Sequence, residues 1–204
     1  MRKGGGKEKG RVAEVEVAKM ISLWWTNGKD KDAFWRNVSS GGRVHKVASP
    51  YSGDICPVKE TIKGFRLHVE VKKQEGWSFE GVIKQNKSEP LLEFIAQTVY
   101  DTSLSDRVGI LLFTRNRDSW YVFLPHIWYG APFFGDFAVH HTLLYIDPCW
   151  EVREHFKSKY KKDLQLGGYV VSWKAFSKFY TRSKLKKWLK TYSQRQKALK
   201  GKGN

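Results

Sequence analysis

Cysteine is scarce in this sequence, and long apolar runs are missing. Two of the 204 residues are cysteine, Cys56 and Cys149, which is too few for a disulfide framework or a zinc-binding spacing. No apolar run approaches the roughly 18–20 residues that span a bilayer. The basic first residues are not followed by the apolar segment of a secretory signal. We therefore expect an intracellular protein, in the cytoplasm or nucleoid, without a membrane partner.

Acidic residues are also in short supply, above all toward the C-terminal end. The chain has 37 Lys and Arg against 20 Asp and Glu, a formal net charge of +17. No acidic residue follows Asp163, whereas basic residues accumulate there, among them Lys184, Lys186 and Lys187. This imbalance predicts a polyanionic partner, most often nucleic acid. A solubilising tail and a basic helix on a membrane surface are the alternatives.

The pattern of apolar residues and turn signals predicts an α/β fold. The expected order is a helix, several strands, a helix, two strands, a variable segment, a strand and a last helix, which is typical of a mixed central β-sheet flanked by helices. The expected helices cover residues 11–26, 88–101, 150–160 and 172 onward, and the expected strands cover 34–38, 54–58, 65–73, 107–114, 119–124 and 169–171.

The expected organisation is one main domain with basic ends. Residues 1–10 are predicted to be a flexible basic arm and residues 11–173 the main domain. Within that domain, residues 126–171 are expected to be a variable insertion or extension. Residues 174–204 are expected to form a basic C-terminal helix and tail.

The strand expected at residues 65–73 carries a candidate chemical site. Its residues alternate, so that Glu70 and Lys72 share one face, together with His68. Asp54 lies on a separate short strand that could pair beside them. Two converging carboxylates form a hard-oxygen site suited to Mg²⁺ or Mn²⁺, and an adjacent lysine can stabilise charge on a phosphate or orient a water. The ordinary alternative is a solvent-facing ion pair on an amphipathic strand.

This arrangement resembles the signature of the PD-(D/E)xK nuclease superfamily, in which an acid is followed, after a variable gap, by acid-x-Lys on the next strand. Here the residues are Asp54 and then Glu70-Val71-Lys72. The proline that usually precedes the first acid is Gly53 in this chain. The resemblance implies a restriction-endonuclease-like core and a metal site that includes the Val71 carbonyl.

Within the superfamily, the chain is most similar to archaeal-type Holliday junction resolvases over residues 9–125. The similarity rests on Lys9-Gly10, on Ala13-Glu14-Val15-Glu16 and on the loop Arg36-Asn37-Val38-Ser39-Ser40-Gly41. It implies that Glu14 completes the metal site and that Arg36 and Ser40, or Ser39, hold DNA near the scissile phosphate. The resolvases often have a basic residue where Val15 stands.

The resemblance and the charge together predict a Mg²⁺-dependent DNA endonuclease, with Mn²⁺ as a substitute. The resemblance implies a homodimer that cuts branched DNA such as four-way junctions. Small size and basicity would also suit a phage or mobile-element enzyme. The expected catalytic residues are Glu14, Asp54, Glu70, Lys72 and Ser40; the metal ligands are Glu14, Asp54, Glu70 and Val71; the DNA contacts are Arg36, Ser39, Lys73, Lys184, Lys186 and Lys187.

Three other functions stay open from the sequence. One is a sequence-specific restriction or homing endonuclease. Another is a non-catalytic nucleic-acid-binding protein whose acids form surface ion pairs, and the third is a structural ribosome-associated protein. Gln97 and Tyr100, one helical turn apart, resemble a motif of exonucleases in the same superfamily, but an ordinary helix explains them equally well, and Gln97 is not placed among the catalytic residues.

Overall fold

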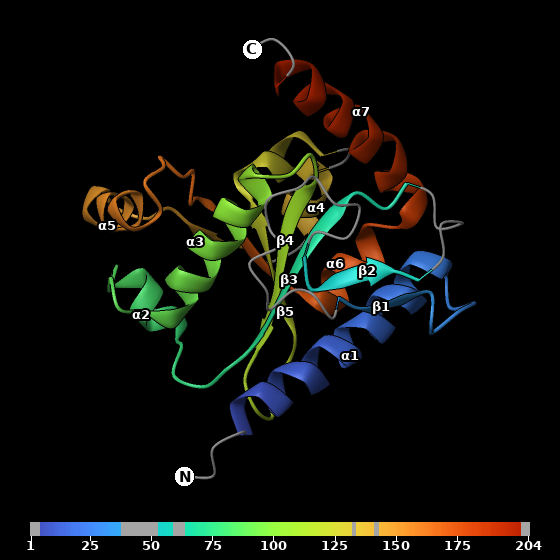
Figure 1. Ribbon diagram of the computed structural model, residues 1–204, viewed down its shortest axis with the longest axis horizontal. Helices are drawn as coiled ribbons and strands as arrows, with labels where there is room; N and C mark the ends of the chain where they lie inside the picture. The colour runs from blue at the N-terminus through green and yellow to red at the C-terminus, as the bar shows by residue number, and fades with distance from the viewer. Residues whose placement is uncertain (1–4, 38–52, 59–63, 132–133, 141–142, 201–204) are drawn as a thin grey trace.

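The computed structural model describes residues 5–37, 53–58, 64–131, 134–140 and 143–200 (Figure 1). Its centre is a five-stranded sheet with the order β3-β4-β5-β7-β6, beside a two-stranded sheet of β1 and β2. β3 and β4 are parallel and the other pairs are antiparallel, so the sheet is mixed, as predicted. The strands are β1 (Phe34–Arg36), β2 (Ile55–Pro57), β3 (Leu67–Lys73), β4 (Val108–Thr114), β5 (Tyr121–Pro125), β6 (Leu144–Ile146) and β7 (Gly168–Ser172).

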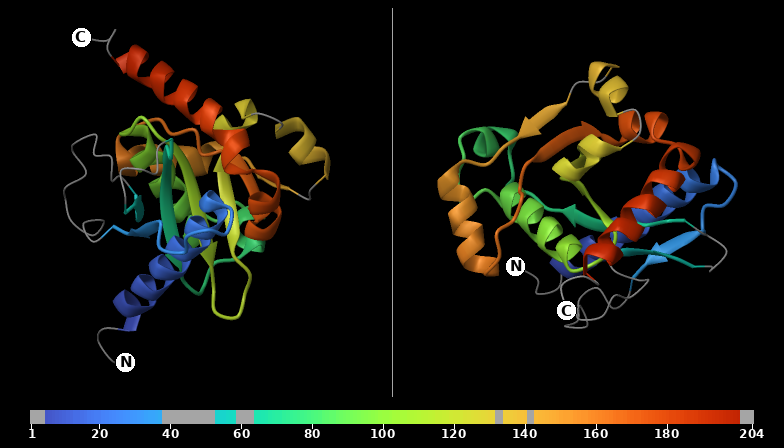
Figure 2. Two further views of the ribbon diagram at one scale, coloured as in Figure 1. Left: turned by 90° about the vertical axis from the view of Figure 1, so that its right-hand side faces the viewer. Right: turned by 90° about the horizontal axis from the view of Figure 1, so that it is seen from above.

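Helices cover both faces of the central sheet (Figure 2). One apolar core lies between the sheet and α1, η1, α4, α6 and α7, and a second lies between the sheet and α2, α3 and α5. This confirms the predicted α/β class and is consistent with a restriction-endonuclease-like core. The helices are α1 (Gly5–Thr26), α2 (Phe79–Ile83), α3 (Pro90–Ser103), η1 (His126–Gly130), α4 (Phe134–His140), α5 (Trp150–Tyr160), α6 (Trp173–Phe179) and α7 (Arg182–Lys200).

The alternation along β3 sends its residues into two different environments. Leu67, Val69 and Val71 enter the core beneath α1 and α7. His68 and Glu70 project to the other face, toward α3, where they are 3% and 6% exposed. The predicted sharing of a face is confirmed, but α3 covers this face at His68 and Glu70, and only Lys72 stays partly exposed.

Two predicted helix boundaries are wrong. The first helix begins at Gly5, before the expected residue 11, although it ends at Thr26, where Asn27 and Gly28 have positive φ of 53° and 79°. The second long helix is capped by Glu89, whose side chain accepts a hydrogen bond from the Leu91 N–H, and not by Ser88. Further, the segment expected to be a loop after β3 contains the short helix α2, capped by Ser78.

The single C-terminal helix expected from the sequence is two helices, α6 and α7. The break falls at Tyr180, which has extended dihedral angles of φ −88° and ψ 93°. Tertiary contacts explain the break: the Trp24 indole N–H donates to the Tyr180 carbonyl, and the Tyr180 ring is fully buried against Trp128 and Phe137. Helix propensity alone does not register these contacts.

The segment 126–171, predicted to be a variable insertion or extension, contributes strands to the central sheet. It supplies β6 and most of β7, and β7 pairs with β5 along its whole length.

Among the described residues, no helix is both long and apolar enough to cross a membrane.

Candidate active site

Glu70 is the centre of a compact polar group under α3. Its Oε1 atom lies 2.9 Å from the Lys72 ammonium and accepts a hydrogen bond of 3.3 Å from the Gln97 side chain. Its Oε2 atom lies 3.9 Å from His68 Nε2. The three β3 residues share a face because of the strand's period of two, and α3 adds Gln97 from above.

Asp54 is held against the edge of β3, on the side away from β4. Its backbone N–H donates to the Val69 carbonyl over 2.7 Å, and its Oδ2 atom accepts from the Val71 N–H over 2.9 Å. Asn37 anchors the same turn, because its N–H donates to the Asp54 carbonyl over 2.6 Å. Although β2 pairs with β1 and not with β3, these bonds place the Asp54 carboxylate beside Glu70 and Lys72.

Gly53 makes this approach possible. Its φ is +93°, which proline cannot adopt, because its ring fixes φ near −65°. A Cβ atom on Gly53 would lie 2.8 Å from the Val69 carbonyl oxygen and 2.9 Å from the Val69 nitrogen. The glycine that replaces the usual proline of the signature is therefore required by the local backbone.

We expect Gly53→Ala to lower the free energy of unfolding by about 2–3 kcal/mol and to reduce any activity, because the new Cβ must push Asp54 away from β3. Gly76→Ala is the matched control, since Gly76 has a φ of +86° and nothing within 4 Å of a built Cβ. Urea unfolding of both variants separates the contact with Val69 from the cost of positive φ. If Gly53→Ala and Gly76→Ala lowered the free energy of unfolding equally, the close approach of Gly53 to the Val69 backbone would be contradicted.

The site has an excess of negative charge. Burial, followed by repulsion from Glu70, raises the pKa of Asp54 from 3.8 to about 8, and the Val71 N–H and Lys72 only partly oppose this rise. Burial disfavours the ammonium of Lys72, but Glu70, Asp54 and Asp101 outweigh it and raise the pKa of Lys72. Lys72 is thus held charged. A second cation near the carboxylates would relieve the repulsion between Asp54 and Glu70 that Lys72 leaves.

The described residues contain one group of three metal-ligating side chains whose ligand atoms all lie within 4.8 Å of one another. These are His68, Glu70 and Asp101. Carboxylate oxygens suit Mg²⁺ and Mn²⁺, and an imidazole suits several transition metals. The sequence reasoning missed Asp101, although it follows Gln97 by four residues and therefore shares its helix face.

Glu14 and Arg36, both predicted to be functional, form an ion pair. The Arg36 Nε atom donates to Glu14 Oε2 over 2.9 Å, and both side chains are largely buried. Glu14 also adds to the repulsion that raises the pKa of Asp54, so its charge is felt at the site. Glu14 is outside the three-residue group above, and its role as a metal ligand stays a prediction, as does the contact of Arg36 with DNA.

The remaining predicted DNA contacts lie in two places. Lys73, at the end of β3, has its ammonium 3.9 Å from Glu16. Lys184 lies on α7 over the Phe179 ring, and the Lys186 side chain passes beside Gly64, just before β3 begins. Lys184, Lys186 and Lys187 all lie on α7. In Figure 1, α7 and the N-terminus of α1 are at opposite ends of the molecule. Ser39 and Ser40 lie outside the described residues.

Comparison with known proteins supports the assignment to the PD-(D/E)xK superfamily. The family model described as "Phage putative PDDEXK endonuclease" matches residues 5–187, which cover the main domain and the first part of α7. No curated protein and no solved structure matches the chain. The match confirms the PD-(D/E)xK resemblance, whereas the similarity to archaeal resolvases stays a prediction. By this match, which covers more than half of the chain, the chain belongs to the PDDEXK family that this model describes.

Proposed function

We propose that the protein is a Mg²⁺-dependent endodeoxyribonuclease whose centre is formed by Asp54, Glu70 and Lys72. The observation that carries the proposal is the placement of the Asp54 carboxylate on the Val71 N–H, next to the Glu70–Lys72 pair. This brings two carboxylates and an ammonium, from segments 16 residues apart, to one edge of the sheet. Phosphodiester hydrolysis requires a cation site, a charge to offset the phosphate and a place to activate water.

Each residue has a specific task in this proposal. Asp54 and Glu70, with the Val71 carbonyl, hold the divalent cation, and Glu14 completes the set directly or through water. When bound, such a cation lowers the pKa of a water and offsets charge on the phosphate. Lys72 places a fixed positive charge beside Glu70, where it orients the attacking water or binds a phosphate oxygen. Gln97 holds Glu70 in position through its hydrogen bond.

The donors present fit a divalent cation. A carboxylate whose pKa is raised by burial and by a second carboxylate gains most from a cation that neutralises both. His68 and Asp101 lie close to Glu70 and supply further donor atoms. Because most of these donors are oxygens, we propose Mg²⁺ as the resident ion and Mn²⁺ as an effective substitute.

We further propose branched DNA, including four-way junctions, as the substrate, and a homodimer as the active form. The support is the residue pattern around Glu14 and Arg36, together with the basic surface of α7. Two copies acting together would introduce paired nicks. A sequence-specific endonuclease is the main alternative, and it would cut linear duplex at defined positions.

A cleavage panel tests the proposal. Linear duplex, flapped, single-stranded and four-way DNA are incubated with Mg²⁺, Mn²⁺ or EDTA, and products are resolved on denaturing gels. We expect cutting with Mg²⁺ and Mn²⁺, none with EDTA, and the highest rate on the four-way junction. Sedimentation measures the oligomeric state in parallel.

The panel also distinguishes the alternatives. Site-specific cutting of linear duplex would replace the junction preference while leaving the nuclease proposal intact. DNA binding without cutting under any metal would refute the nuclease and favour a non-catalytic binder. Copurification with ribosomal RNA and indifference to Mg²⁺ would instead favour a ribosome-associated protein.

A further inference from the structure

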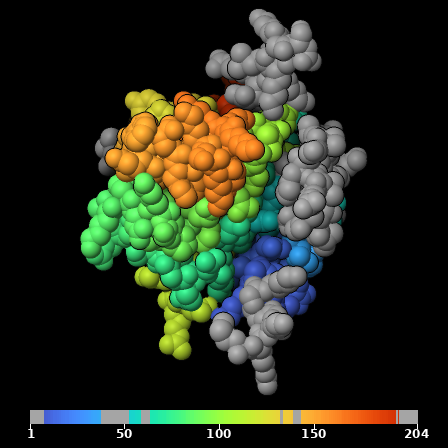
Figure 3. Space-filling view, turned by 60° about the vertical axis from the view of Figure 1, so that its left-hand side comes forward, coloured from blue at the N-terminus to red at the C-terminus, as the bar shows by residue number. Residues whose placement is uncertain are grey.

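The loop between β4 and β5, residues 115–120, projects beyond the body of the molecule. It forms the extended yellow-green turn near the N-terminal half of α1 in Figure 1, and in Figure 3 it protrudes from the lower end of the surface. The loop starts directly after Thr114, which pairs in register with Lys73, the last residue of β3. It therefore extends from the same end of the sheet as Lys72 and Lys73.

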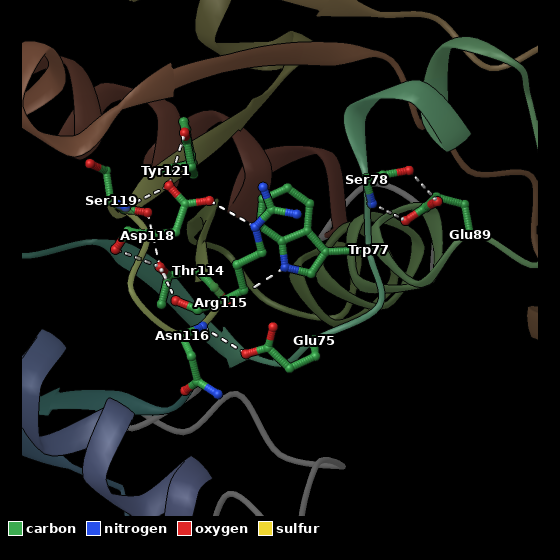
Figure 4. Close-up of polar contacts among 10 residues, drawn as sticks. All are labelled: Glu75, Trp77, Ser78, Glu89, Thr114, Arg115, Asn116, Asp118, Ser119 and Tyr121. Atoms are coloured by element: carbon green, nitrogen blue, oxygen red, sulfur yellow. Dashed lines mark hydrogen bonds and ion pairs between the residues drawn. The ribbon is translucent and has the colours of Figure 1, made fainter.

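A network of hydrogen bonds braces this loop (Figure 4). The Asn116 N–H donates to the Glu75 carboxylate over 2.7 Å, which ties the loop to the segment after β3. The Thr114 hydroxyl lies within hydrogen-bond distance of three loop carbonyls, including that of Ser119 at 2.9 Å. The Asp118 carboxylate accepts from the Ser119 N–H and the Tyr121 hydroxyl. The loop is therefore held in one shape before any partner arrives.

The two arginines of the loop are used differently. Arg115 folds back along the loop, where its Nε donates to Asp118 over 2.9 Å and its half-exposed guanidinium lies 5.1 Å from the centre of the Trp77 ring. Arg117 is exposed at the tip with a positive φ of 60°, and within the described residues no ion pair involves it. In Figure 4 the Asn116 side chain also points away from the braced network.

One cation at the loop tip is left without an ion-pair partner among the described residues. Asp118 pairs with Arg115, and the Glu75 carboxylate is turned to the Asn116 N–H, whereas no ion pair of Arg117 is found there. A guanidinium forms a two-pronged contact with a phosphate, and a loop that is already rigid loses little conformational freedom when it binds. Arg115 follows Leu111, the register partner of Glu70, by four positions, a rise of about 13 Å at 3.3 Å per residue, and Arg117 lies further along the loop.

We propose that Arg117 binds a backbone phosphate of the DNA that flanks the cleavage site, with the braced loop as its rigid support. The inference rests on the proposed function for the identity of the substrate. Arg117 here positions DNA and takes no part in the chemical step. A contact at the loop tip, beyond the end of β4, would lie a few nucleotides from the phosphate held at Glu70 and Lys72.

Equilibrium binding in EDTA tests this contact without cleavage. Arg117→Gln removes the charge and leaves a shorter, neutral polar side chain. DNA affinity is measured for this variant and for the wild type across a salt series. We expect affinity to fall about three- to tenfold near 0.1 M salt, and the slope of log K against log salt to become shallower by about one. Its urea unfolding curve should match the wild type.

Two control variants complete the experiment. Lys157→Ala removes an equal charge from α5, where the lysine forms only an exposed pair with Glu154, and it should leave affinity and slope unchanged. Arg115→Gln should lower stability, because Arg115 holds Asp118 and Trp77. An unchanged affinity and salt slope for Arg117→Gln would overturn the inference, even if the wild type cuts DNA. Weaker binding by this variant, in a protein that cuts no substrate, would support the contact while the nuclease proposal fails.

Discussion

Asp54→Asn and Glu70→Gln should each lower the rate of DNA cleavage on the order of 10³-fold or more, while DNA binding persists. Either change removes a negative oxygen from the cation site without changing the size of the side chain. In Asp54→Asn, the new amide oxygen would still accept a bond from the Val71 N–H, so the turn should keep its shape. Single-turnover cleavage and binding assays in EDTA measure the two effects separately.

The matched control for these variants is Asp136→Asn, which neutralises an exposed acid on α4. It should cut at the wild-type rate. If Asp54→Asn retained more than about a tenth of that rate, the assignment of Asp54 as a cation ligand would be wrong. If it lost binding as well as cutting, the carboxylate would have a structural role instead.

The stability of the metal-free protein should depend on pH through Asp54. Its pKa is 3.8 ordinarily and about 8 in the fold, so between these values the native state binds a proton that the unfolded chain has released. The free energy of unfolding should therefore fall as pH rises from about 4 to about 8, by about 1.4 kcal/mol per pH unit at the steepest. Urea unfolding in EDTA should show a shallower decline for Asp54→Asn.

Lys72→Met is the second change with a large expected effect, a loss of cleavage on the order of 10²-fold. The variant removes the ammonium 2.9 Å from Glu70 and leaves the two carboxylates with less compensation. Because Lys72 lowers the pKa of Asp54, its loss should raise that pKa further. The acidic limb of the rate–pH profile should therefore move to higher pH. If Lys72 had only a structural role, its replacement would not move this limb.

Lys73→Met provides the comparison, since it removes the next lysine along β3, whose ammonium lies 3.9 Å from Glu16 and outside the pair with Glu70. It should weaken DNA binding modestly and leave the pH profile in place. A Lys72→Met variant with a normal turnover rate and weaker binding would show that Lys72 is a phosphate contact and has no part in the chemical step.

Local patterns predicted the elements that depend on local rules. The period of two in residues 65–73 placed Glu70 and Lys72 on one face, and the Asn27-Gly28 pair marked the end of α1. The split of the last helix was missed because it depends on Trp24, which lies 156 residues away from Tyr180. Likewise, Glu89 and not Ser88 caps α3, because the Glu89 carboxylate also accepts from the Ser78 N–H that starts α2.

In the site, too, the sequence predicted some features, and distant contacts decided others. The resemblance identified Asp54, Glu70 and Lys72 as candidates, and it drew attention to Gln97 without placing it at the site. Nothing in the sequence indicated that α3 would cover these residues or bring Asp101 to them. The sequence also presented Glu14 as a ligand and Arg36 as a DNA contact, and the structure pairs them with each other. Which charged groups meet depends on how helices and strands pack, and that is not a property of any short segment.

By itself, the sequence determined the α/β class, the basic character and the acid–acid-x-Lys pattern, because strand periodicity, net charge and residue order are local or additive properties. The tertiary structure alone decided that Gly53 must lack a side chain, that Glu70 is buried beneath α3, and that Arg115 of the β4–β5 loop lies over the Trp77 ring. These outcomes follow from contacts between segments far apart in the chain, where close packing and desolvation set the energies.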